Sequence, residues 1–331
     1  NIMMRIFLKL FIFAMPFVAL YLIMDPFRVL RSYDDYLKGW LVEVNQNYVS
    51  TEVYLKNHIR YGYDSFIFGS SRTMGYRTND WKMYLGEGSS PFVFNGTLDT
   101  ISRIRDKLRL IDSQGGMIKN GLFIVSIDAT FSDRKLNNHW VIDHPVVSNG
   151  SWIYFHYVFF KAFYTKYFYK IFEDFGDYGQ KAFLNPKNQA KLDPTTNDYF
   201  YSSAEQLLSE DPSAYYDRLG WIFFARDYQK KVSNQLITAQ HQNDMNGIMD
   251  ILRKHNTTYR VIIDPLYDQI YINPDDLSII SKVFGKQNVY DFTGKNEITE
   301  NIYNYYETSH YRPHVGKKLM EIIYRSSIRS D

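Results

Sequence analysis

The chain begins with an almost unbroken apolar run and then changes to short apolar segments separated by amphipathic stretches. The first run, Ile6 to Met24, is about twenty residues long, which is enough for a helix to cross the hydrocarbon core of a bilayer. No small-x-small pattern precedes Asp25-Pro26, so we expect an uncleaved anchor, with a cleaved signal peptide as the alternative. Arg5 and Lys9 favour a cytoplasmic amino terminus, although two arginines follow the run. The rest of a single-pass protein would then lie on the extracytoplasmic side of the cell membrane.

Beyond residue 64, short β-type runs alternate with stretches whose apolar residues recur at helical spacing. Such alternation favours a parallel, doubly wound sheet with helices on its faces. Ligands of such sheets lie at the carboxyl ends of the strands. The predicted strands are Phe66 to Phe68, Phe92 to Phe94, Leu122 to Ile127, Tyr259 to Ile263 and Val289-Tyr290, and the predicted helices are Thr97 to Lys119, Tyr228 to His255, Asp275 to Val283 and His314 to Tyr324.

The first of these strands ends abruptly in Gly69-Ser70-Ser71, a small polar turn at the edge where ligands bind. Near the other end of the chain, Glu307 precedes His310 by three residues. A serine, a histidine that takes its proton and a carboxylate that orients the histidine are the groups that nucleophilic acyl chemistry requires. Each signal alone is common in ordinary turns, and their pairing at the two ends of one α/β pattern is what favours a site. Asp291 and Asp128 are alternative acids for His310.

These residues resemble the motif blocks of the SGNH (or GDSL) hydrolase superfamily, within it the membrane-anchored branch of glycan O-acetyl-handling proteins and the D-alanyl transfer protein of teichoic acid synthesis. The resemblance implies that Ser71, in Gly-Ser-Ser, is the nucleophile, and that Glu307 and His310 are the acid and base of the last block. It also implies that Asn95-Gly96, after the second strand, supplies a glycine amide to the oxyanion hole.

The third block of the family, Gly-x-Asn-Asp, is not matched. At its position the strand from Ile124 ends in Asp128, so the asparagine that would donate to the oxyanion is missing. Asp128 is then structural, a substrate contact or a replacement with another role. Arg72, next to the nucleophile, is a candidate for binding an anionic substrate or for pairing with a local acid.

The expected fold is therefore α/β, a flavodoxin-like, three-layer α/β/α arrangement with about five parallel strands, preceded by one transmembrane helix. We expect a membrane anchor over residues 1–25, a juxtamembrane segment over 26–63 and the SGNH-like domain over 64–331, with an aromatic-rich insertion at about 143–220. Within the insertion, Trp152 to Phe175 is about half aromatic with three lysines. Three interpretations of this stretch are open: an interfacial helix that lies on the membrane, a wall of rings that stack on sugars, or a helix packed on the sheet.

Composition narrows the function. The 331 residues suffice for a full α/β core, and the net charge of +2 gives no indication of a nucleic-acid partner. The chain has no cysteines, which excludes disulfides, cysteine nucleophiles and thiolate metal sites. It lacks phosphate-binding and dinucleotide motifs as well as convincing metal-ligand spacing, so we expect neither a cofactor nor a metal.

The sequence thus predicts a membrane-anchored serine esterase or O-acyltransferase that acts on an O-acylated, most plausibly O-acetylated, cell-surface or exported polysaccharide. The polysaccharide follows from the resemblance alone. The alternative is a catalytically weak glycan-binding or assembly partner of a membrane-bound acyltransferase. A third reading is a scaffold that works through the aromatic insertion.

Overall fold

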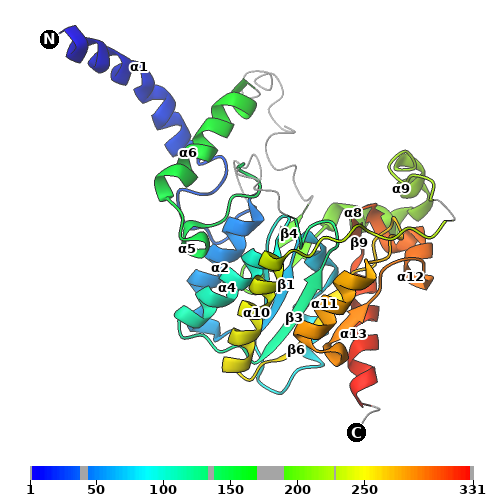
Figure 1. Ribbon diagram of the computed structural model, residues 1–331. Helices are drawn as coiled ribbons and strands as arrows, with labels where there is room; N and C mark the ends of the chain where they lie inside the picture. The colour runs from blue at the N-terminus through cyan, green and yellow to red at the C-terminus, as the bar shows by residue number, and fades with distance from the viewer. Residues whose placement is uncertain (1, 38–43, 133–137, 170–189, 227–228, 329–331) are drawn as a thin grey trace.

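A computed structural model describes residues 2–37, 44–132, 138–169, 190–226 and 229–328. Its centre is a sheet of five parallel strands in the order β2-β1-β3-β6-β7 (Figure 1). All five predicted strands are present, and the class α/β is confirmed. The strands are β1 (Ser65–Gly69), β2 (Pro91–Asn95), β3 (Asn120–Val125), β6 (Thr258–Ile263) and β7 (Val289–Asp291).

Successive side chains of a strand point to opposite faces of the sheet, and both faces are buried here. In β1, Phe66 and Phe68 belong to one apolar core and Ile67 belongs to a second. The first core includes side chains of α2, α4, α10 and α11, and the second includes side chains of α3 and α13. These helices are α2 (Gln46–Tyr61), α3 (Thr78–Lys82), α4 (Ile101–Ser113), α10 (Ala239–Lys254), α11 (Pro274–Phe284) and α13 (Pro313–Ile328).

Two helices begin later in the structure than the sequence predicts. The prediction for Thr97 to Lys119 is wrong at both ends, because α4 spans only Ile101–Ser113. The helix predicted from Tyr228 begins at Ala239, where the Thr238 side chain caps it together with His241. Before that cap the chain is extended, and Val232 pairs with Tyr271. The apolar residues at helical spacing thus continue into the segment before Thr238, the capping residue at which the helix begins.

The direction of α2 determines at which edge of the sheet the first helix joins the α/β domain. This helix leads into β1 and packs Val49, Val53 and Tyr54 into the first core, so it belongs to the α/β body although it falls in the expected juxtamembrane segment. Because α2 runs antiparallel to β1, its amino end lies at the carboxyl edge of the sheet. The apolar helix α1 (Ile2–Met24) precedes it and is long and apolar enough to span a membrane. Figure 1 shows α1 leaving from that edge.

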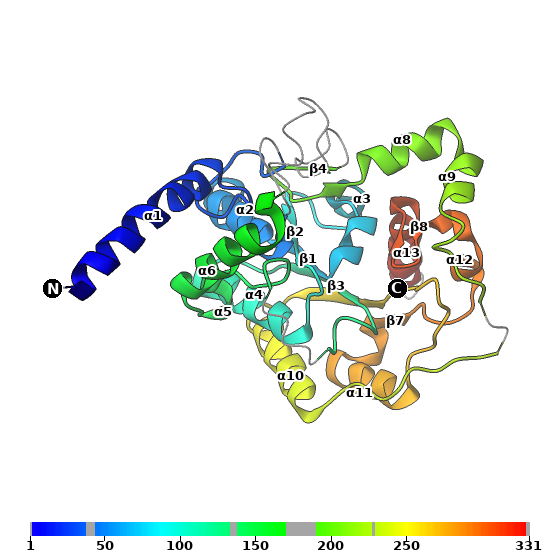
Figure 2. The same cartoon turned by 90° about the horizontal axis from the view of Figure 1, so that it is seen from above.

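The insertion forms two separate helical parts on opposite sides of the molecule (Figure 2). The helix α6 (Trp152–Ala162) and the π-helical turn η2 (Phe163–Tyr167) lie against α1, whereas α8 (Ser202–Glu210) and α9 (Pro212–Arg218) pack against the segment that contains Tyr306. Of the aromatic stretch predicted to Phe175, residues 170–175 lie outside the described residues. The remaining elements of the insertion are α5 (Pro145–Ser148) and the pair β4 (Lys191–Leu192) and β5 (Tyr199–Phe200).

The last elements carry one half of the predicted site. A short antiparallel hairpin, β8 (Tyr305–Glu307) and β9 (His310–Tyr311), precedes α13. Short helical turns connect the elements around it: η1 (Ser71–Gly75), η4 (Lys286–Asn288), α12 (Glu297–Glu300) and η5 (Ile302–Asn304).

Candidate active site

The serine turn follows β1 at the carboxyl edge of the sheet. Gly69 has a φ of +150°, and a Cβ on it would lie 2.7 Å from the carbonyl oxygen of Ile124 on the neighbouring strand. Only glycine fits such a close approach to the next strand. The chain then enters the 3₁₀ turn η1, in which Ser71 is the first residue and Ser70 the cap. The sequence Gly-Ser-Ser thus places Ser71 at the start of a short helix, where amides have no intrahelical partner.

The structure brings Ser71, His310 and Glu307 together. The Oγ atom of Ser71 is 2.7 Å from Nε2 of His310, although the two residues lie 239 positions apart. The other ring nitrogen, Nδ1, contacts Oε1 of Glu307. The histidine is therefore bonded on one side to a hydroxyl and on the other to a carboxylate, which is the arrangement that general-base activation of a serine needs.

Glu307 is held as an anion. Burial opposes its ionisation, but hydrogen bonds from His310 and from the Ser309 amide outweigh burial and lower the pKa of the carboxyl. The Ser309 amide donates to Oε2 at 2.7 Å. An ionised carboxylate on Nδ1 requires the proton of a neutral imidazole to lie on that nitrogen, which leaves Nε2 free to accept from Ser71.

Arg72 is buried beside the nucleophile and forms two parallel hydrogen bonds with Asp128, both 2.7 Å long. Its Nε donates to the Ser309 carbonyl at 2.9 Å. Burial opposes the charge of Arg72, but Asp264 and Asp128 outweigh it and raise the pKa of the guanidinium. Of the two roles considered for Arg72, the structure contains the pairing with a local acid, and this pair ties the strand end at Asp128 to the loop between Glu307 and His310.

A third carboxylate, Asp264, lies beneath Arg72 and was not singled out from the sequence. It is completely buried at the end of β6, and its Oδ2 lies 3.7 Å from Nε of Arg72 and 2.7 Å from the Ser126 hydroxyl that donates to it. Burial raises its pKa to about 7, with Arg72 acting in the opposite direction. Its Oδ1 has no hydrogen-bond partner among the described residues. The available signal was its position directly after a predicted strand, the same position that drew attention to Asp128.

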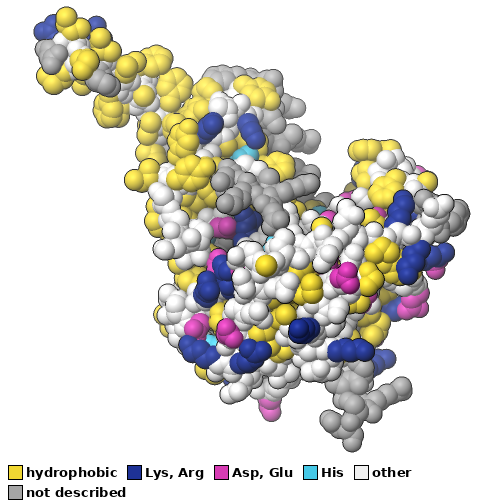
Figure 3. Space-filling model, in the orientation of Figure 1, with side chains coloured by type: hydrophobic (Ala, Val, Ile, Leu, Met, Phe, Trp, Pro, Cys, Tyr) yellow, Lys and Arg dark blue, Asp and Glu magenta, His cyan; other side chains and the backbone are white. Residues whose placement is uncertain are grey.

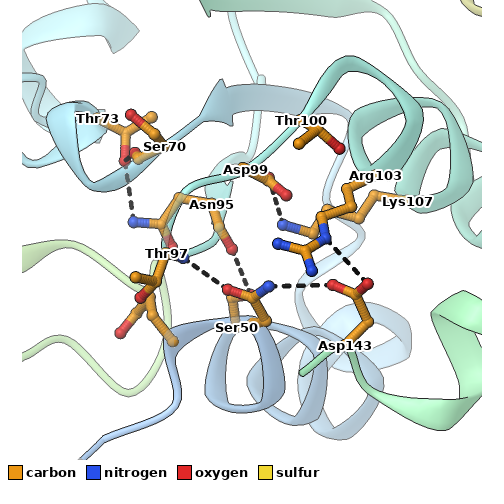
Figure 4. Close-up of polar contacts among 12 residues, drawn as sticks. Ser50, Ser70, Thr73, Asn95, Thr97, Asp99, Thr100, Arg103, Lys107 and Asp143 are labelled. Carbon is orange, nitrogen blue, oxygen red and sulfur yellow. Dashed lines mark hydrogen bonds and ion pairs between the residues drawn. The ribbon is translucent and has the colours of Figure 1, made fainter. Parts of the chain in front are cut away.

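Asn95 and Gly96 both make hydrogen bonds to the chain around the serine turn. The amide of Gly96 donates to the Gly69 carbonyl at 3.2 Å, which extends the pairing of β1 and β2 by one residue. Because an amide has a single proton, the Gly96 amide is engaged within the sheet in this arrangement, and its role as an oxyanion donor stays a prediction. The Asn95 side chain is buried and donates to Oγ1 of Thr73 at 2.9 Å, so it supports the serine turn from below (Figure 4).

Further polar groups connect this support to α2 and the insertion. Ser50 of α2 donates to the Asn95 carbonyl at 2.7 Å, and Gln46 donates to its side-chain oxygen at 3.0 Å. Asn47 accepts from the Thr97 amide and donates to Asp143. Polar residues spaced along one face of α2 were the sequence signal for this network, and it was missed because α2 was assigned to the juxtamembrane segment.

One backbone amide at the site, that of Ser71, is available to donate to an oxyanion. The Ser71 amide makes no hydrogen bond with any described part of the chain. Asp128, at the position of the third block, is a carboxylate committed to Arg72 and has no proton to donate. Beside it a cavity of about 410 Å³ opens, lined in part by Asp128, Leu266 and Asp268. The arrangement therefore combines a serine hydroxyl, a histidine bonded to that hydroxyl and to a carboxylate, and one backbone amide without a partner among the described residues. The cavity is lined by Asp128 and not by Ser71, His310 or Glu307.

No known protein-family model matches the chain, and no characterised protein resembles it at a significant level. The geometry of the site and the architecture around it are therefore the grounds for a function.

Proposed function

We propose that this protein is a serine esterase or O-acyltransferase of SGNH type. The observation that carries the proposal is the continuous contact from Ser71 Oγ through both nitrogens of His310 to Glu307. Ser71 attacks the acyl carbonyl while its proton passes to Nε2 of His310. The tetrahedral intermediate then collapses, the C–O bond to the alcohol breaks, and His310 returns the proton to the leaving oxygen. Water or a sugar hydroxyl next attacks the acyl-serine, with His310 again taking a proton, and releases the acid or the new ester.

The architecture supports this assignment. Counted along the central sheet, the strand order is 2-1-3-4-5, which is the order of flavodoxin-like folds. We propose a three-layer α/β/α domain of that kind, with Ser71 and His310 at the carboxyl edge. Helix α1 would anchor it as a single-pass protein with the site on the extracytoplasmic side.

The substrate we propose is an O-acylated, most simply O-acetylated, polysaccharide of the cell surface or an exported one. It follows from the resemblance to membrane-anchored SGNH proteins. The cavity beside Asp128 does not include Ser71, His310 or Glu307 in its lining, but it offers room for a part of the polysaccharide away from the reacting ester. Its polar groups, including Asp128 and Asp268, together with the apolar Ile127 and Leu266, offer partners for both the hydroxyls and the C–H faces of a sugar.

A second function is favoured by one observation. With the Gly96 amide used inside the sheet and Asp128 paired, the Ser71 amide is the backbone donor left for an oxyanion. Removing one such donor typically costs about 10²–10³ in rate. A protein with so few donors suits a glycan-binding or assembly partner of a membrane-bound acyltransferase.

The test is labelling of the full chain in detergent with a fluorophosphonate probe, together with turnover of p-nitrophenyl acetate. We expect the wild type to label and turn over, and both Ser71→Ala and His310→Ala to lose at least about 10³-fold in rate, because the nucleophile or its base is gone. The matched controls are Ser113→Ala and His314→Ala, whose side chains contact Leu110 and Asn304 and no part of the triad.

Labelling that survives in Ser71→Ala would place the reactive serine elsewhere and reject the proposed roles. A folded wild type that neither labels nor turns over would shift the assignment to the partner function. In that case a membrane acyltransferase should co-purify with the wild type.

A further inference from the structure

The aromatic segment α6–η2 lies against the second half of α1. The rings of Tyr21 and Phe160 are 5.2 Å apart, and those of Tyr21 and Phe163 are 5.7 Å apart. Nearer the middle of α1, Phe17 contacts Tyr164 and Phe168, each at 6.0 Å between ring centres. The aromatic segment α6–η2 therefore packs along the second half of the apolar helix, while its buried side chains Phe155 and Phe159 join the first core.

These contacts determine how deep in a bilayer the aromatic segment would lie if α1 spans it. From Phe17 to Met24 the chain rises about 10 Å along the helix axis, and the whole of α1 is about 34 Å long. A bilayer core is about 30 Å thick, so a spanning α1 ends close to the boundary between hydrocarbon and headgroups. Phe17 then lies several ångströms inside that boundary, and Tyr164 and Phe168, which contact it, lie at the same depth.

The side chains that α6 leaves uncovered are those of a membrane interface. Ile153 is 85% exposed, Tyr157 55% and Trp152 44%, although Phe155 and Phe159 of the same helix are buried. Trp and Tyr are enriched at headgroup level because their rings are amphipathic. Figure 3 shows hydrophobic side chains covering α1 and much of α6, while the α/β body is mostly polar on this view.

Basic groups lie beside this apolar surface. Lys161 and Lys166 are exposed on α6–η2, and no acidic residue is present between Trp152 and Tyr169. At the end of α1, Arg31 donates to the carbonyls of Leu22 and Ile23 at 2.8 and 3.0 Å. Aromatic rings next to lysines and arginines match a layer of phosphate headgroups above acyl chains.

The junction between α1 and the body is a fixed turn. Asp25 is completely buried, and its carboxylate accepts from the amides of Val29 and Leu30 and from the Tyr33 hydroxyl. Phe27 then packs between Phe159 and Tyr167 of the aromatic segment. The orientation of α1 is thus coupled to that of α6, so placing one in a bilayer places the other.

We propose that α6–η2 is a second membrane-contacting element, which lies at the boundary between headgroups and hydrocarbon on the extracytoplasmic side, with the exposed face of α6 at headgroup level and η2 reaching into the hydrocarbon, and which holds the carboxyl edge of the sheet towards the bilayer. The occupant of its exposed face is lipid. This inference stands on the packing of α1 with α6 and does not depend on the chemistry proposed for Ser71.

The absence of cysteines allows a direct test, because any introduced cysteine is the only one. Ile153→Cys and Ile59→Cys form a matched pair: both isoleucines lie on helices and are 85% and 88% exposed, but Ile59 lies at the far end of α2, near the opposite edge of the sheet. The full chain would be labelled with NBD at each position and reconstituted into phosphatidylcholine vesicles that contain lipid with a nitroxide near the headgroup.

We expect the nitroxide lipid to quench the label at position 153 at least about threefold more than the label at position 59, because quenching requires contact within roughly one helix diameter. Tyr157→Cys should behave like Ile153→Cys. Circular dichroism checks that each labelled protein is folded, and exposed positions should tolerate the change. Equal quenching at 153 and 59 would overturn the proposal, since α1 alone would then hold the protein to the vesicle.

Discussion

At the scale of single residues, two glycines allow the turn that carries Ser71 and the strand that carries His310 to lie close together. A Cβ at Gly316 of α13 would overlap the carbonyl oxygen of Gly75, at the end of the serine turn, and a Cβ at Gly75 would overlap the ring of Tyr311. Tyr311 follows His310 directly. The absence of two side chains therefore allows α13 and the histidine strand to approach Ser71 closely enough for the 2.7 Å contact.

Gly316→Ala should separate these elements. The methyl group meets rigid backbone, so we expect a loss of about 1–3 kcal/mol in the free energy of unfolding. We also expect at least a tenfold slower reaction of Ser71 with the fluorophosphonate probe, since about 1.4 kcal/mol in the barrier gives that factor. Gly86→Ala is the control, because nothing lies within 4 Å of its Cβ position. A Gly316→Ala protein with unchanged stability and labelling would contradict the close approach.

Asp264 makes stability depend on pH. Its folded-state pKa is raised to about 7, above the ordinary value of 3.8, so between these values the folded protein binds more protons than the unfolded chain. Its contribution to stability is therefore largest at low pH and falls as the pH rises from about 4 to 7. Asp264→Asn keeps an acceptor for Ser126 and removes the titration.

We expect the free energy of unfolding of Asp264→Asn, from urea titrations in detergent, to fall less steeply between pH 4 and pH 7 than that of the wild type. The exposed Asp250→Asn serves as the comparison and should follow the wild type. Parallel curves for Asp264→Asn and the wild type would show that Asp264 does not titrate in this range.

These residues also show which parts of the site could be predicted from the sequence and which could not. Ser71, His310 and Glu307 stood in short motifs with a chemical reason for each residue type. Gly316 lies in a helix and belongs to no motif, and its role depends on its contact with Gly75, which precedes it by 241 positions. Asp264 is one of many acids, and its burial and its contact with Arg72 follow from tertiary packing alone. The hydrogen bond of the Gly96 amide to Gly69, which extends the ladder between β1 and β2, is likewise not visible in the spacing of the motif.

At the scale of elements, the insertion supports the hairpin that carries Glu307 and His310. The hydroxyls of Tyr215 and Tyr216 on α9 donate to the carbonyls of Tyr306 and Tyr305 at 3.0 and 2.7 Å. Glu205 on α8 accepts from the Tyr306 hydroxyl at 2.6 Å and from two nitrogens of Arg312. Helices far from the site in sequence thus hold the strand that positions its base.

Glu205→Gln should loosen this hairpin without removing any group that contacts substrate. Because the charge that holds Arg312 is lost, we expect a several-fold slower reaction with the fluorophosphonate probe and a change of at most about 1 kcal/mol in the free energy of unfolding, as for partly exposed ion pairs. Glu210→Gln, on the same helix but exposed, is the control. A rate equal to that of the control would indicate that the tyrosines alone fix the hairpin.

At the scale of the whole molecule, topology was predictable because apolar periodicity identified every central strand. Phe66 to Phe68 and Val261 to Ile263 are uniformly apolar, as strand segments buried on both faces must be. Boundaries were less predictable: the apolar spacing before Ala239 continued into an extended segment, and α2 looked like a linker because its buried face includes Asn47 and Ser50. Polar groups that pair with each other inside a protein cannot be told from solvated ones in a sequence.

The buried turn at Asp25 has a consequence for how the site meets its substrate. In the proposed membrane-anchored state, a domain on a long flexible linker would explore a volume above the membrane. A domain fixed to its anchor within a few residues would instead move with the lateral diffusion of α1. Encounters then depend on the number of partners per area of membrane instead of their concentration in solution. Such geometry favours acceptors that are delivered to the membrane surface, and the same protein released into detergent would meet them as rarely as any soluble enzyme.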